Sequence, residues 1–167
     1  MNLDSMKDIL AAVQREDKPM WEIILETDME NRGVTREDSM AKMAQAWRAM
    51  VEASDSYNGK RHSASGLVGG QGEQMRTYAA SGDPISGGFA AQVIAEALCM
   101  GESNACMRRI VAAPTAGACG VLPGAFLSAA EERGLGDDAI VDGLLVAAAV
   151  GVLVAMRAPI SGAIGGC

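Results

Sequence analysis

The sequence has few of the residues on which common catalytic sites depend. Its only histidine is His62, and no lysine follows Lys60. A Ser–His–Asp triad would rest entirely on a histidine in the charged run NGKRH, which is more typical of a solvated boundary segment. A pyridoxal phosphate Schiff base needs a lysine, so this cofactor is disfavoured for the Gly-rich part of the chain.

Basic residues are also in the minority, since 21 Asp and Glu against 14 Lys and Arg give a net charge of -7. Without a basic stripe, a nucleic acid partner is disfavoured. The chain has no Gly-Lys-Ser/Thr loop and no GxGxxG after a convincing strand, which disfavours nucleotide binding. The N-terminal MNLDSMKDILAAVQRED lacks the basic start and apolar centre of a secretory signal, so we expect a cytoplasmic protein.

Cysteines are sparse and irregularly spaced. The four are not arranged as CxxC pairs and do not resemble the framework of a disulfide-rich secreted domain, which leaves free thiols or metal ligands: Cys99, Cys106, Cys119 and Cys167. The first three lie in Ala-rich stretches where small buried thiols are common, and we interpret these three as structural.

The chain does contain enough apolar residues, 49% of 167, for a soluble domain with a core. Only Gly33 and Gly59 of its 20 glycines precede residue 66. We therefore divide the chain into an N-terminal helical segment, 1–60, and a Gly/Ala-rich helical region, 61–167. Strand propensity is low throughout, and we predict an all-α, bundle-like fold whose Gly-rich loops form the site.

Local signals place several helices. Apolar residues recur at helical spacing from Met6, and Pro19 suits the first turn of a second helix. Thr35 and Asp38 have the spacing of a capping box before a third helix, whose Met and Trp residues we assign to the core. Further helices are expected over 89–100 and about 120–133, and turns at 65–74 and 81–88.

Segment 139–156, AIVDGLLVAAAVGVLVAM, is long enough to cross a membrane. Asp142, two glycines and several alanines fit protein neighbours better than lipid, so we predict a buried core helix. A membrane-embedded carrier fragment is the alternative for this segment.

Three loops combine a hydroxyl with glycines: 65–72, 113–118 and 161–163. Loops of this kind can present backbone N–H groups to an anion such as a carboxylate. Each alone is also typical of an ordinary tight turn.

Together, the strings SGLVGG (65–70), SGDPISGG (81–88), NACMRRIVAAPTAGACGVLPG (104–124) and APISGAIGGC (158–167) resemble the alpha chain of the two-subunit, iron-sulfur-dependent bacterial L-serine dehydratases. The resemblance extends over residues 1–167 and is most specific at APTxGAxGxxPG and SGAxGGC. It implies a pyridoxal-independent lyase that converts L-serine to pyruvate and ammonia. An open iron of a four-iron, four-sulfur cluster would act as the Lewis acid.

The resemblance also implies site residues. Cys167 matches the first cluster cysteine, in a Gly-rich loop that lets a bulky cluster approach the backbone. Further ligands are expected beyond residue 167, so we expect the front part of a longer chain that is inactive alone. No general base is identified, and the resemblance implies a hetero-oligomer in which a β chain completes the site. The substrate contacts are expected from Ser65, Gly66, Gly69, Gly70, Thr115, Gly117, Ser161 and Gly162.

A noncatalytic helical module that binds a small carboxylate is the alternative function. Cluster content separates the two, because such a module has no reason to bind iron at Cys167.

Overall fold

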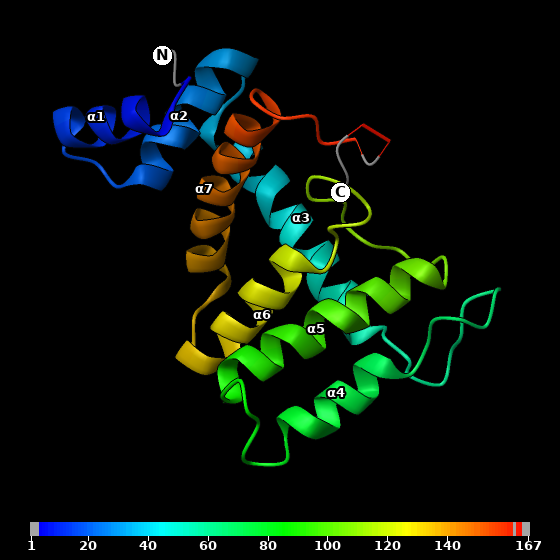
Figure 1. The fold of residues 1–167 in the computed structure, drawn as a ribbon. Coiled ribbons are helices and arrows are strands. Elements are labelled where there is room, and N and C mark those ends of the chain that lie inside the picture. Colours follow the sequence, from blue (N-terminus) through cyan, green and yellow to red (C-terminus); the bar gives the residue numbers. More distant parts are fainter. Residues whose placement is uncertain (1–3, 162, 165–167) are drawn as a thin grey trace. The chain divides into compact units, whose positions relative to one another are not determined.

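A computed structural model describes residues 4–161 and 163–164 of the chain (Figure 1). Within these residues the chain forms seven α-helices and no strand, which confirms the all-α prediction. The helices are α1 (Met6–Glu16), α2 (Met20–Arg32), α3 (Arg36–Asp55), α4 (Gln71–Ala79), α5 (Gly88–Ala105), α6 (Val121–Arg133) and α7 (Asp137–Ala155).

The helices belong to two compact units. The first contains the described residues up to Trp47 and those from Gly136 onward, and the second runs from Arg48 to Leu135. The change in glycine content near residue 60 therefore does not coincide with the division into units. The division falls within α3, whose first part belongs to one unit and whose last turns belong to the other.

Capping side chains start two helices of the first unit. The Ser5 hydroxyl accepts a hydrogen bond from the Asp8 amide at the start of α1. At the start of α3, the Asp38 amide donates to Thr35 Oγ1 at 3.1 Å and the Thr35 amide donates to Asp38 Oδ2 at 3.2 Å. This reciprocal pair confirms the predicted capping box.

The core of the first unit is built on Ile24, Leu25 and Leu145, with partly buried methionines from α2 and α3 packed against them. Trp47 is buried, and its indole Nε1 donates to Asp137 Oδ1 at 2.8 Å. These contacts confirm that the Met and Trp residues of this unit contribute to packing.

Helix α7 corresponds to the predicted segment 139–156, but it is buried on one side only. Its buried residues are Ile140, Val141, Leu144, Leu145 and Leu153, whereas Val150, Val152 and Val154 are exposed. Only 28% of its most apolar window is buried within the described part of the chain. Among the described residues, the prediction of a buried core helix therefore holds for one side of α7 only, because α7 is apolar around most of its circumference while its own unit covers one side.

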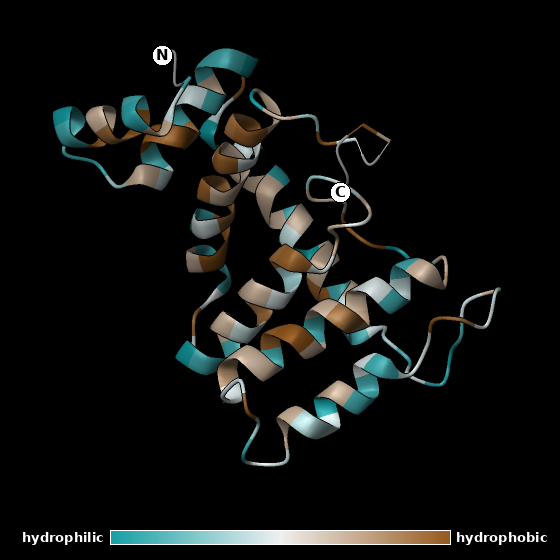
Figure 2. Ribbon diagram, viewed as in Figure 1, coloured by the Kyte–Doolittle hydropathy of each residue, from teal (hydrophilic) through white to brown (hydrophobic). Residues whose placement is uncertain are grey.

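By length and composition alone, α7 could cross a membrane, with a mean hydropathy of 2.1 over that window. Figure 2 shows its apolar residues along most of its length. Core helices of soluble proteins meet the same criterion. Asp142 lies on this helix, and partial burial together with the neighbouring Asp138 raises the pKa of its carboxyl group.

In the second unit, α5 lies between α4 and α6 (Figure 1). Glycines allow both approaches. A Cβ on Gly72 of α4 would lie 2.8 Å from Cys99 Sγ of α5, and a Cβ on Gly124 of α6 would lie 2.9 Å from the Val93 carbonyl oxygen. Since α5 packs against both α4 and α6, it lies next to the loops that lead into these two helices.

Candidate functional site

The SGLVGG turn is a closed loop held by its own hydrogen bonds. The Ser63 amide donates to the Val68 carbonyl at 2.8 Å, and the Gly66 amide donates to the Ser63 carbonyl at 2.9 Å. The Ser63 and Ser65 hydroxyls lie 3.1 Å apart, and Ser65 is exposed. The turn therefore presents a hydroxyl group to solvent, while several of its amides are already engaged.

Two kinds of constraint require glycine in this turn. Gly66 and Gly70 have φ values of 74° and 89°, which L side chains rarely adopt. Gly69, with a φ of 150°, packs on an earlier part of the same loop, since a Cβ there would lie 2.9 Å from His62 Cα. The same contact places His62 beside the turn, which its position in the charged run did not indicate.

The N-terminus of α4, directly after this turn, is capped by Glu102 of α5. Glu102 Oε1 accepts hydrogen bonds from the Gln71 amide at 2.6 Å and the Gly72 amide at 3.0 Å. Its Oε2 accepts from the Tyr57 hydroxyl at 2.5 Å, and that hydroxyl accepts from the Glu73 amide at 3.1 Å. The Gln71 and Gly72 amides, which could have bound an external anion, thus donate their hydrogen bonds to the Glu102 carboxylate instead.

This environment favours the charged form of Glu102. Burial raises the pKa of its carboxyl group, but hydrogen bonds from the Tyr57 hydroxyl and from the amides of Gly72 and Gln71 outweigh that effect, so the pKa lies below its ordinary value. Burial, followed by the bond to Glu102, raises the pKa of Tyr57. Tyr57 therefore remains a neutral donor to an ionised Glu102.

A second carboxylate on α5, Glu96, binds the middle of α4. Arg76 donates to Glu96 Oε1 through Nε at 3.1 Å and Nη2 at 2.9 Å, and Ser54 donates to Oε2 at 2.8 Å. The Arg76 guanidinium also lies 5.0 Å from the centre of the Tyr57 ring. Arg76 is therefore committed to holding α4 on α5.

The PTAGACG loop is attached to the end of the same helix. Asn104 of α5 donates through Nδ2 to the Ala116 carbonyl at 3.0 Å. Within the loop, the Ala118 amide donates to Thr115 Oγ1 at 3.3 Å. Thr115 is half-buried and Gly117 is exposed, so the loop offers a second hydroxyl group held in a defined turn.

The predicted substrate residues therefore fall into three groups. Ser65, Gly66, Gly69 and Gly70 lie in a loop attached through Glu102, and Thr115 and Gly117 lie in a loop attached through Asn104. The last turn of α5 is thus bonded both to the start of α4, directly after the first loop, and to the second loop. Ser161 is exposed and belongs to the other unit, while Gly162 and Cys167 lie outside the described residues.

Residues 15–167 match the family model described as "Serine dehydratase alpha chain". The chain belongs to the serine dehydratase alpha chain family. It is 30% identical over 163 residues to a "Probable L-serine dehydratase, alpha chain" of Bacillus subtilis, an alignment that covers 98% of this chain and 54% of the relative. It is 29% identical over 167 residues to the "L-serine dehydratase, alpha chain" of Peptoniphilus asaccharolyticus, covering 99% of this chain and 57% of that one.

An "L-serine dehydratase" of Helicobacter pylori is 31% identical over 176 residues, covering 99% of this chain and 37% of the relative. The chain thus spans about half the length of the Bacillus subtilis and Peptoniphilus asaccharolyticus alpha chains, and a smaller share of the Helicobacter pylori protein. No solved structure matches it.

Sequence reasoning missed the residues that anchor the two family loops: Tyr57, Glu102 and Asn104. The only available signal was an acid and an amide in the string GESNA at the end of an otherwise Ala-rich helix. Charged and amide residues at a helix end are usually solvated, so this signal gave no reason to place them under loops.

The described cysteines do not form a site for an iron-sulfur cluster. Cys99 and Cys119 are buried, and burial raises the pKa of the Cys99 thiol to about 11. Burial also raises the pKa of the Cys119 thiol. Over residues 4–161 and 163–164, no three His, Cys, Asp or Glu side chains are grouped as metal ligands would be. For Cys99 and Cys119, this burial supports the structural interpretation.

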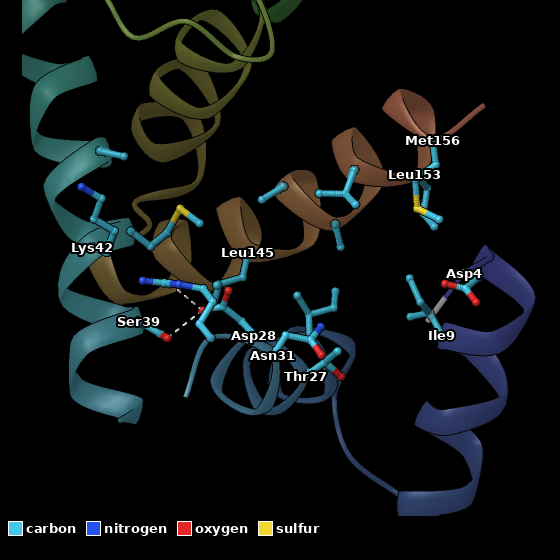
Figure 3. A pocket seen from close by; sticks show the side chains of 17 residues that line it. Asp4, Ile9, Thr27, Asp28, Asn31, Ser39, Lys42, Leu145, Leu153 and Met156 are labelled. Atoms are coloured by element: carbon cyan, nitrogen blue, oxygen red, sulfur yellow. Dashed lines mark hydrogen bonds and ion pairs between the residues drawn. The ribbon is translucent and has the colours of Figure 1, made fainter. Parts of the chain in front are cut away.

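The first unit contains a cavity of about 440 Å³ (Figure 3). Its apolar lining includes Leu145 and Leu153 of α7. At its polar end, Asp28 Oδ2 accepts hydrogen bonds from Ser39 at 2.7 Å and Arg32 at 2.9 Å. None of the predicted substrate residues lines this cavity.

Proposed function

We propose that the chain carries substrate-binding loops of an L-serine dehydratase, which converts L-serine to pyruvate and ammonia. The observation that carries the proposal is the attachment of two family loops, with the Ser65 and Thr115 hydroxyls, to the last turn of α5. The names of two relatives that align with nearly the whole chain, both L-serine dehydratase alpha chains, support serine as the substrate.

In this proposal, the chain binds and orients serine. The hydroxyls of Ser65 and Thr115 donate hydrogen bonds to the substrate carboxylate. Fixing the carboxylate orients the Cα–H bond toward the group that removes the proton. Loss of the α-proton and of the β-hydroxyl gives aminoacrylate, which tautomerises to an imine that water hydrolyses to pyruvate and ammonia.

We propose that the cluster ligands and the other catalytic groups come from outside the described residues. We propose Cys167 as one ligand of a four-iron, four-sulfur cluster whose other ligands lie beyond the 167 residues. When bound, such a cluster would supply Lewis acidity toward the departing hydroxyl. The described residues do not provide a cluster site, and the proposed roles of Ser65 and Thr115 rest on the structure of their loops. A companion β chain is proposed to complete the site.

The test is an anaerobic assembly that combines this chain, the segment by which the relatives are longer, and a β chain. We expect L-serine to release pyruvate, and the 167 residues alone to be inactive and poor in iron. Pyruvate can be followed by its reduction with lactate dehydrogenase. A complete assembly that binds L-serine but holds no iron and releases no pyruvate would support the carboxylate-binding module instead.

A further inference from the structure

Glu102 is a buried carboxylate whose two oxygens are both used. It is 5% exposed, and a charged group at such a position is unfavourable unless donors compensate it. Two amides at the start of α4 and the Tyr57 hydroxyl provide these donors. The positive end of the α4 dipole favours the same negative charge.

The bonded amides follow directly on the SGLVGG turn. Gln71 and Gly72 are the first two residues of α4, and Gly70 is its N-cap. A carboxylate that holds these amides therefore fixes the end of the turn relative to α5. Gly72 permits the arrangement, because a Cβ there would lie 2.8 Å from Cys99 Sγ and 2.9 Å from Tyr57 Oη.

The same turn of α5 holds the PTAGACG loop. Asn104 follows Glu102 by two residues and binds the Ala116 carbonyl. One helix end thus determines the positions of both loops, with one side chain for each.

We propose that Glu102 is a positioning residue. It fixes the end of the SGLVGG turn on α5, and so keeps Ser65 at a constant position relative to the loop that carries Thr115. This inference rests on the proposed function for its effect on serine, but the fixing of the turn can be measured without turnover. It also means that two amides at the end of the 65–72 loop, those of Gln71 and Gly72, are bonded to Glu102 and are not available to an external carboxylate.

The test compares Glu102→Ala and Glu102→Gln with Glu96→Gln in the complete assembly. Glu96 is a matched control, because it is also a carboxylate of α5 bound to α4, but its partners are Arg76 and Ser54 rather than the turn. We expect Glu102→Ala to raise the serine KM about tenfold with a kcat within about twofold of wild type. Glu102→Gln keeps an oxygen that accepts from both amides, so we expect it to restore most of this loss.

A second measurement follows hydrogen exchange of a peptide that spans 63–75. Glu102→Ala should speed exchange at Gln71 and Gly72 at least tenfold, whereas Glu96→Gln should lower the melting temperature and leave these amides protected. If Glu102→Ala does not fold, Glu102→Gln and Tyr57→Phe are compared in its place, and each should give a smaller change in the same direction.

The two measurements separate the possible failures. If wild-type assembly releases no pyruvate, the proposed function fails and the exchange measurement alone decides whether Glu102 fixes the turn. Unchanged exchange in Glu102→Ala, or faster exchange with unchanged KM and kcat in an active assembly, would overturn the positioning role. An equal rise in KM for Glu96→Gln would overturn it too, because the effect would then follow stability rather than the turn.

Discussion

Replacing Gly120 by alanine tests how closely α6 approaches α5. A Cβ at Gly120 would lie 3.0 Å from Ala97 Cα and 3.1 Å from the Ala97 carbonyl carbon, with the carbonyl oxygen closer still. The φ of Gly120 is -87°, a value that alanine adopts freely. Its substitution therefore tests packing, without added backbone strain.

The expected cost follows from what the new methyl group would meet. Overpacking a core costs about 1–3 kcal/mol, and we expect the upper end here because the neighbours are backbone atoms of a regular helix. At about 2–4 °C per kcal/mol for a chain of this size, Gly120→Ala should lower the melting temperature by about 6–12 °C.

Gly101→Ala is the matched control. Gly101 lies inside α5, and nothing is within 4 Å of the position of its Cβ. Alanine there should stabilise the helix by about 0.5–1 kcal/mol. Thermal unfolding followed by circular dichroism at 222 nm measures both variants. A Gly120→Ala melting temperature equal to that of wild type would refute the packing of α6 on α5, and a loss of stability in Gly101→Ala would contradict the open space around Gly101.

Further expected outcomes concern the site. Thr115→Val should lower kcat/KM for serine by roughly 5- to 150-fold while iron content is kept, and unchanged kinetics would remove Thr115 from the site. In the complete assembly, Cys167→Ser should lose iron and sulfide whereas Cys99→Ser should keep them, and a full cluster in the Cys167 variant would contradict the ligand assignment. Because hydrogen bonds hold the pKa of Glu102 below its ordinary 4.5, its contribution to stability is complete above that pH and is lost as the pH falls through the folded-state pKa. Glu102→Gln should therefore flatten the acid side of a plot of unfolding midpoint against pH, and an unchanged acid limb would show that Glu102 does not carry this dependence.

The helices could be predicted because their signals are local. The capping pair Thr35 and Asp38 is three residues apart, and the expected helix over about 120–133 is observed as Val121–Arg133. Such patterns depend on residues that are close in sequence. They are therefore visible without knowledge of what each helix packs against.

The anchors of the loops could not be predicted for the opposite reason. Tyr57 and Glu102 are 45 residues apart, and Glu102 and Gln71 are 31 apart. A single sequence does not tell which acid pairs with which helix N-terminus. The residue type alone favoured a solvated surface, and only the packing of α4 on α5 brings the partners together.

The extent to which α7 is buried could also not be predicted from the sequence. Composition measures how apolar a helix is around its circumference, whereas burial depends on how many of its sides have neighbours. Leu145 packs against Ile24 and Leu25, while Val152 and Val154 remain exposed. A run of apolar residues therefore predicted the helix and its buried side correctly, but not that its other side is exposed.

The glycines in and next to the two loops serve mainly for close packing. Their abundance suggested turns that present amides to an anion, but Gly69, Gly72 and Gly120 occupy positions where a Cβ would meet backbone or buried side-chain atoms. Only Gly66 and Gly70 are explained mainly by positive φ values in an open turn. Since several amides of the SGLVGG segment are donated within the protein, glycine substitutions there would report on packing more than on substrate. Hydroxyl substitutions at Ser65 and Thr115 are accordingly the sharper test of serine binding, because they remove the proposed donor and add no atom at the close glycine contacts. The loop bonds that they remove are the Ser63–Ser65 contact and the Ala118–Thr115 hydrogen bond.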